Sequence, residues 1–139
     1  MAATSLEARS RIGETEKLTI NLGVVDLGQI DLLVQEGFYS NRTDLIRTAI
    51  RNQLSVHGEA VKQTVARRTL VLGLQQFTRA DLEHALAAGH MLQIQVLGLA
   101  RIANDVSPEL ARATIQSVEV LGAFHASAAV RSALADRIL

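Results

Sequence analysis

Three polar side chains that alternate along a short segment are the residues of this sequence best suited to binding chemistry. Lys17, Thr19 and Asn21 occupy every second position, and apolar residues fill the positions between them. Because successive side chains of a β-strand point to opposite faces, the polar groups share one face and the apolar groups share the other. The pattern predicts a half-buried strand over residues 17–22 whose polar face can bind a polar partner through hydrogen bonds.

Residue constellations that support catalysis or metal binding are weak. The chain has no cysteine, which excludes disulfides and thiolate metal sites. The histidines are scattered along the chain, at His57, His84, His90 and His125. His84 and His90 are six residues apart and do not share one helical face. Because the sequence also lacks a Gly-rich phosphate loop, a nucleophile elbow and a usefully spaced carboxylate pair, we expect a protein that is not an enzyme, with no cofactor and no bound metal.

Two predicted helices follow the strand. Asp26, with a glutamine three residues later, forms a capping-box pattern, and apolar residues then recur at helical spacing until Gly37, which predicts a helix over about 27–36. Asn41 is the expected N-cap of a second helix, with Asp44 at its third position. The expected buried stripe of this second helix is Leu45, Ile46, Ala49, Ile50 and Leu54.

This strand-helix-helix segment is too small to be stable alone. Cores built from fewer than about 45 residues usually need a metal, disulfides or a partner chain. Two copies of the strand that pair antiparallel across a two-fold axis would satisfy each other's edges and place both apolar strand faces on four helices. The segment is therefore predicted to form a homodimer through its strand.

The strand LTINL, the two helices and the junction GFYSNRTDLIR between them resemble the ribbon-helix-helix repressors. These are dimeric β-ribbon proteins related to the methionine and phage Arc repressors and to plasmid copy-number and nickel-responsive regulators. The resemblance covers residues 16–54. It implies a two-stranded ribbon, one strand from each chain, that lies in the major groove of double-stranded DNA. The histidine and cysteine ligands of the nickel-responsive branch are absent, because the chain has no cysteine.

The resemblance also implies roles for individual residues. A lysine can donate to guanine, an asparagine can bond adenine through two atoms, and a threonine can take either role. At the start of the second helix, backbone N–H groups and the helix dipole would bind a phosphate. The implied base contacts are Lys17, Thr19 and Asn21, and the implied phosphate contacts are Ser40, Asn41, Arg42 and Thr43. The alternative is that the polar strand residues form only a solvated face.

Composition limits the remaining possibilities. The chain of 139 residues is 48% hydrophobic and 20% charged, which is typical of a globular protein. Its 14 basic and 14 acidic residues balance, so DNA binding must depend on a local patch rather than on net charge. No apolar run approaches the ~18 residues of a membrane span, and the N-terminus lacks the apolar core of a signal peptide. We expect a cytoplasmic protein with no membrane partner.

The sequence changes character after residue 69 and repeats itself. The tripeptide Val-Leu-Gly recurs at 71–73, 96–98 and 120–122, intervals of 25 and 24 residues that are typical of stacked repeats. Helix starts follow each copy, at Thr78, Ser107 and Ser127. The expected inward-facing helical residues are Leu82, Leu86, Leu110, Ala113, Val130 and Leu134.

These repeats predict about three strand-plus-helix or strand-plus-turn units. Their Val-Leu-Gly strands are expected to lie parallel in a solenoid-like stack, with a bend or close backbone approach at each glycine. The alternative is that the spacing is an accident of an alternating β/α domain. No named family is evident for this half of the chain.

The sequence as a whole predicts an α+β chain with a dimeric N-terminal β-α-α unit and a C-terminal module of parallel β repeats. The expected division is a flexible arm over 1–15, a ribbon-helix-helix domain over 16–56, a linker or short helix over 57–68 and a repeat and oligomerisation domain over 69–139.

The function that follows is that of a sequence-specific DNA-binding transcriptional regulator, expected to act as a repressor. Its C-terminal module would mediate oligomerisation beyond the dimer or sense a signal. Two alternatives remain open: a self-assembling structural or partition protein tethered to DNA, and the antitoxin of a toxin-antitoxin pair. The operator sequence and any ligand lie outside what the sequence determines.

Overall fold

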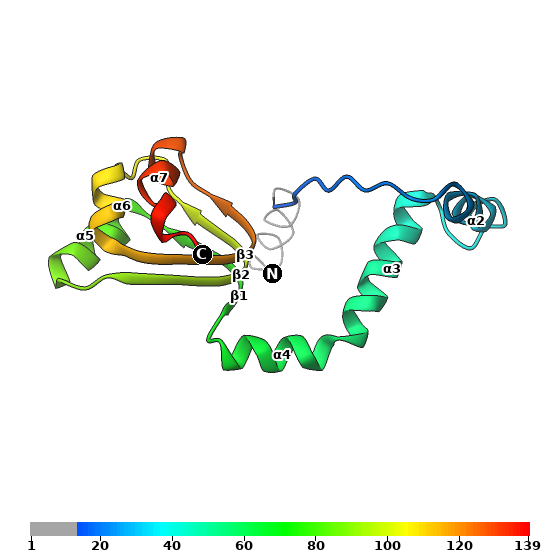
Figure 1. The fold of residues 1–139 in the computed structure, drawn as a ribbon, viewed down its shortest axis with the longest axis horizontal. Helices are drawn as coiled ribbons and strands as arrows, with labels where there is room; N and C mark the ends of the chain where they lie inside the picture. Colours follow the sequence, from blue (N-terminus) through cyan, green and yellow to red (C-terminus); the bar gives the residue numbers. More distant parts are fainter. Residues whose placement is uncertain (1–13) are drawn as a thin grey trace, which may run out of the picture. The chain divides into compact units, whose positions relative to one another are not determined.

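The computed structural model describes residues 14–139 of the chain (Figure 1). The arm expected over 1–15 therefore lies, as far as residue 13, outside the described residues. Contacts divide the described chain into two compact units, residues 15–64 and residues 65–139, and residue 14 groups with the second. The first contains helices and the second contains a three-stranded parallel sheet with helices, so the mixed α+β composition is confirmed.

α2 (Val24–Gln35) begins earlier than the capping-box pattern predicted. Its N-cap is Gly23, which has no side chain to cap the helix, and Asp26 lies within the first turn. A carboxylate there is favoured by the positive end of the helix dipole, so Asp26 acts from inside the helix rather than in front of it. The end of the helix agrees with expectation, because Gly37 has φ +83° and its N–H donates to the carbonyl of Val34 at 3.1 Å.

α3 (Arg42–Val56) begins as the sequence predicted. The side-chain oxygen of Asn41 accepts a hydrogen bond from the backbone N–H of Asp44 at 2.8 Å. The Asp44 carboxylate in turn accepts from the backbone N–H of Ser40 at 3.0 Å. These two bonds fix the turn between the helices. α4 (Gly58–Arg67) follows after His57 alone and occupies most of the connection expected over 57–68.

Residues 14–23, which include the expected strand over 17–22, form neither helix nor strand in the single chain. A strand acquires its hydrogen bonds from a neighbouring strand, and the predicted neighbour is the same segment of a second copy. Strand formation by this segment therefore stays a prediction about the dimer.

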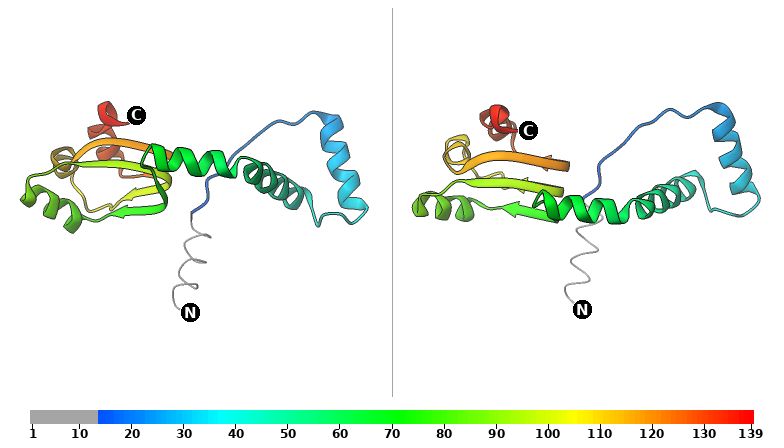
Figure 2. Two further views of the ribbon diagram at one scale, coloured as in Figure 1. Left: turned by 90° about the horizontal axis from the view of Figure 1, so that it is seen from below. Right: turned by 60° about the horizontal axis from the view of Figure 1, so that its bottom comes forward.

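The C-terminal unit repeats a strand followed by a helix three times. Its strands are β1 (Val71–Phe77), β2 (Leu92–Ile102) and β3 (Ile115–His125), and its helices are α5 (Arg79–Ala88), α6 (Pro108–Thr114) and α7 (Ala128–Ala133), followed by the short helix η1 (Ala135–Arg137). The strands are parallel and lie in the order β1-β2-β3, side by side in both views of Figure 2.

The three Val-Leu-Gly tripeptides pair in register across this sheet. Val71 lies opposite Val96, which lies opposite Val120, and the leucines and glycines that follow continue the same alignment. The expectation of three parallel units is therefore confirmed at the level of single residues. The three helix starts are also confirmed, because Thr78, Ser107 and Ser127 each cap the following helix with a side-chain oxygen.

The glycine row explains why the third residue of the tripeptide carries no side chain. Gly73, Gly98 and Gly122 have φ of +120°, +137° and +122°, where a Cβ is strained. A Cβ on Gly98 would also overlap the carbonyl oxygen of Gly73, and one on Gly122 would overlap that of Gly98. The close backbone approach predicted at the repeated glycines is confirmed.

One face of the sheet is covered by α5, α6 and α7. The core between them contains Phe77, Leu82, Ile94, Val96, Ala100, Ile102, Val118, Val130 and Leu134. The expected inward residues Leu82, Val130 and Leu134 are fully buried, but Leu86 and Ala113 are exposed. α5 buries Leu82 with Ala85 instead, so the face of this helix was predicted one residue too far along the chain.

Candidate nucleic-acid interface

Residues 14–23 place both faces of the predicted ribbon in solvent. Lys17, Thr19 and Asn21 are exposed, as their predicted role in base contact requires. Their apolar neighbours are exposed as well, with 80% of Leu18 and 57% of Ile20 accessible. In the single chain the alternation of the sequence is therefore not yet expressed as a buried face and a free face.

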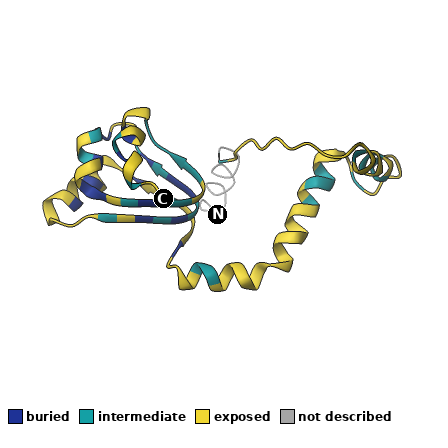
Figure 3. Cartoon of the chain, viewed as in Figure 1, coloured by how far each residue is buried: buried dark blue, intermediate teal, exposed yellow. Residues whose placement is uncertain are grey.

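The helices of the N-terminal unit also lack a core. None of the residues described in α2, α3 and α4 is buried, and Figure 3 shows the buried residues gathered in the sheet unit instead. The expected stripe of α3 is only partly covered, since Leu45 and Ile46 are half-buried and Ile50 and Leu54 are exposed. This unit presents the apolar surface that its sequence predicted for a dimer interface.

A hollow of about 400 Å³ lies at the beginning of α3. It brings together three of the four predicted phosphate contacts: Ser40, Asn41 and Thr43. Two cationic residues that the sequence analysis did not select, Arg47 and Arg51, line the same hollow. Thr43, Arg47 and Arg51 are four residues apart and therefore share one face of the helix, a spacing that the sequence already contained.

Backbone donors at this hollow are partly committed. The N–H groups of Ser40 and Asp44 are used by the two capping hydrogen bonds. The N–H groups of Arg42 and Thr43, at the first two positions of α3, have no acceptor among residues 14–139. Free N–H groups at a helix N-terminus, beside two arginines, favour an anion. Asp44 also lines the hollow, and its negative charge opposes the binding of an anion.

Arg42 does not line this hollow. Its guanidinium forms two hydrogen bonds with the Asp31 carboxylate on α2, at 2.7 Å and 2.8 Å. These bonds lower the pKa of Asp31 and raise the pKa of Arg42, so both side chains are charged at neutral pH. The charge predicted to bind phosphate is instead used to join α2 to α3, and the cations at the hollow come from farther along α3.

A second apolar surface, partly exposed, lies on the face of the sheet opposite its helices; within it Leu99 is buried, and Leu97 and Ala123 are half-buried. Two rows of mostly leucine side chains cross the three strands in register: Leu72, Leu97 and Leu121, and then Leu74, Leu99 and Ala123. Leu72 is 69% exposed, and Leu74 and Leu121 are exposed as well. We call this surface the leucine face.

Two other features are absent from residues 14–139. This part of the chain contains no group of three side chains able to hold a metal ion. None of its helices is long and apolar enough to cross a membrane.

Comparison with known proteins identifies a family. A family model described as the Ribbon-Helix-Helix transcriptional regulator family matches residues 13–131. The resemblance stated for residues 16–54 is confirmed, and the match extends over the three β-α units, for which no family was evident. No curated protein and no solved structure matches the chain.

Proposed function

The chain belongs to the ribbon-helix-helix transcriptional regulator family, and from this membership we propose that it is a DNA-binding repressor that acts as a homodimer. Residues 17–22 of two copies pair antiparallel and form a ribbon in the major groove of double-stranded DNA. The C-terminal unit joins such dimers into larger assemblies.

The proposal of a dimer is supported by the absence of buried residues in the helices of residues 15–64. Leu18, Ile20 and Leu22 alternate with polar residues, and all three are exposed in the single chain. Apolar surface of this extent is stable in water only when another surface covers it. The same segment of a second copy is the self-complementary cover that a two-fold axis supplies, and pairing also satisfies both strand edges.

Pairing turns the polar residues of the ribbon into a reading surface. With the apolar side chains of both strands against the helices, Lys17, Thr19 and Asn21 of each chain point outward together. Their ammonium, hydroxyl and carboxamide groups match the base edges of the major groove. Each residue occurs twice about the axis, so the preferred operator is a pair of inverted half-sites.

The hollow at the start of α3 is the proposed phosphate anchor. The free N–H group of Thr43 binds a phosphate oxygen, and Arg47 and Arg51 supply positive charge on the same helical face. Contacts of this kind hold the protein in register on the DNA and carry no sequence information themselves.

We propose that the leucine face binds the leucine face of another copy. The topology explains why the leucine face is exposed. Each parallel strand is added on the same side of the previous one through a crossover of the same hand, so all the helices lie on one face of the sheet and leave the other face uncovered. Leu72 and Leu121 on this face are exposed, and the ribbon dimer already raises the local concentration of C-terminal units. A self-assembling protein tethered to DNA is the second candidate function that this surface favours.

The decisive experiment on DNA reading is fluorescence anisotropy with DNA from the region upstream of the coding sequence and with scrambled DNA of equal length. The variant Lys17→Ala/Thr19→Ala/Asn21→Ala should lose the preference for upstream DNA and keep its fold. Lys62→Ala/Gln63→Ala, on the exposed surface of α4, is a control that also removes one lysine and one carboxamide. If the triple variant keeps the wild-type preference, the ribbon does not read bases.

Self-association is tested separately by sedimentation. Leu72→Gln/Leu121→Gln should reduce the largest species to the ribbon dimer and leave circular dichroism unchanged, because both side chains are exposed in the folded unit. A wild-type protein that remains dimeric at high concentration would remove the leucine face as an interface.

A further inference from the structure

The C-terminal unit has a row of polar residues at the carboxyl ends of its strands. Gln76 on β1 lies opposite Arg101 on β2, and Arg101 lies opposite His125 on β3. Residues in register across a parallel sheet share one face, so the three side chains project from the same side.

A hollow of about 400 Å³ lies at this edge. Its polar lining comes from the row Gln76, Arg101 and His125 and from Asn104, which follows β2. The segment after β2 is fixed, because the backbone N–H of Ala103 donates to the carbonyl of Phe77 at 3.0 Å. Volumes of roughly 300–1,000 Å³ are typical of small-molecule sites, so the hollow suits a compact ligand.

Arg101 gives the lining of this hollow a positive charge. Neither aspartate nor glutamate lines it. Arg101 is half-buried, and its side chain has no ion pair or hydrogen bond with residues 14–139.

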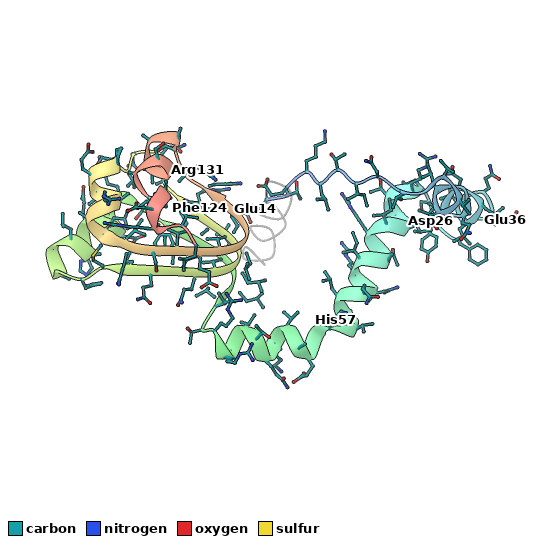
Figure 4. All side chains as sticks on the ribbon, in the orientation of Figure 1. Glu14, Asp26, Glu36, His57, Phe124 and Arg131 are labelled. Carbon is teal, nitrogen blue, oxygen red and sulfur yellow. The ribbon has the colours of Figure 1, made fainter. Side chains whose placement is uncertain are left out.

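Several other arginines of the unit are committed to partners. Arg112 pairs with Asp136 at 2.8 Å. Arg131 donates to the carbonyl of Phe124 at 2.7 Å and lies over its ring, 5.5 Å from the centroid; Figure 4 labels both residues. Arg101 is thus a partly desolvated guanidinium that faces a cavity, a position from which arginine binds planar anions strongly.

We propose that this hollow binds a small organic anion. Its carboxylate or phosphate group accepts two hydrogen bonds from the Arg101 guanidinium. The carboxamides of Gln76 and Asn104, which both donate and accept, select the remainder of the ligand. The site lies wholly within the C-terminal unit, so the proposal of anion binding can be tested separately from the proposal of DNA binding.

The test is an NMR titration of the full-length protein with citrate and, separately, with inorganic phosphate. Sodium chloride of matched ionic strength separates specific binding from charge screening. Backbone amides of residues 76, 101 and 104 should shift and saturate with at least one anion but not with chloride. The stronger of the two anions distinguishes a carboxylate site from a phosphate site. If neither anion shifts these amides up to about 50 mM, a concentration at which a site with a Kd of about 5 mM would be roughly nine-tenths filled, the proposal is wrong.

Two variants connect the response to Arg101. Arg101→Gln should weaken binding at least about tenfold, the usual consequence of losing a charge-assisted hydrogen-bond pair. Arg67→Gln is the matched control, because Arg67 is exposed on α4 and does not line the hollow. Asn104→Ala, at an exposed position after β2, provides a second variant if Arg101→Gln fails to fold. Equal affinity in the wild type and in a folded Arg101→Gln or Asn104→Ala variant would overturn the site.

Discussion

Replacing Arg47 and Arg51 with glutamine tests the phosphate anchor through the salt dependence of DNA binding. Both residues line the hollow at the start of α3, and each would occur twice in the proposed dimer. Each lost phosphate contact lowers the slope of log affinity against log salt by about 0.9. Four lost contacts would therefore lower the slope by about 3.6. Between about 50 and 200 mM salt, the wild type should lose about 150-fold more affinity than the variant.

The assay is anisotropy with the same two DNA duplexes over a salt series. Because phosphate contacts carry no sequence information, the variant should weaken on upstream and on scrambled DNA by similar factors. Its ratio of the two affinities should stay close to that of the wild type. This separates the anchor from the ribbon, where substitution should reduce the ratio itself.

Arg42→Gln is the internal control for this reasoning. The Arg42 side chain pairs with Asp31 and does not line the hollow, so its removal should leave the salt slope nearly unchanged. A large decrease of the slope in Arg42→Gln, with an unchanged slope in the double variant, would refute the assignment. It would show that the pair with Asp31 opens on DNA and that the role implied by the resemblance was right.

Three further predictions concern stability. Ile20→Asp should abolish the dimer in sedimentation, because it would bury an unpaired carboxylate, whereas Asn21→Asp on the polar face should leave the dimer intact. A folded Ile20→Asp dimer would mean that the predicted register of the ribbon is wrong by one residue. Gly98→Ala should destabilise the protein to urea by about 3 kcal/mol or more and Gly73→Ala by about 1–2 kcal/mol, since both have positive φ but only Gly98 also meets a backbone carbonyl; equal losses would mean that this overlap relaxes freely. The arginine partner of Asp31 holds the pKa of that carboxyl below its ordinary 3.8, so the pair stabilises the fold above this pH and the stabilisation is lost as the pH falls through the lowered pKa. The free energies of urea unfolding of the wild type and of Asp31→Asn should therefore converge as the pH falls from about 5 to about 2.

Helix starts could be predicted because capping depends on residues within one turn of each other. Asn41, Thr78, Ser107 and Ser127 each cap the helix that the sequence assigned to them. The exception is instructive. Asp26 has the same local pattern, but the helix extends past it to Gly23, where the backbone alone forms the first turn.

The inward face of short helices was less predictable. α5 has ten residues and α6 has seven, so each offers only two or three positions to the core. Leu86 and Ala113 satisfy helical spacing equally well, yet the sheet selects Ala85 and Ala111 instead. Which residues are buried depends on where the strands place the helix, and periodicity within the helix does not contain that information.

The fate of Arg42 also depended on a contact distant in sequence. Its partner Asp31 is eleven residues earlier, on a different helix, and no local pattern indicates the pair. The stripe of Thr43, Arg47 and Arg51 had a local signal, because its members recur every four residues along one helix. A helical projection of the predicted second helix would have identified these cations as companions of Thr43.

The distribution of charge explains how a chain with 14 basic and 14 acidic residues could still bind DNA. Two acidic side chains of the N-terminal unit, Asp26 and Asp31, lie on α2, and Glu36 is its C-cap; Figure 4 labels Asp26 and Glu36. The cations Arg47 and Arg51 lie on α3, and Lys17 lies on the ribbon segment. Because the interaction between exposed charges is screened beyond about 10 Å, a phosphate interacts mainly with the charges of the element that it contacts. We therefore expect DNA to meet the ribbon and the beginning of α3, with α2 directed away from the phosphates, and the dimer to present that local excess of positive charge twice.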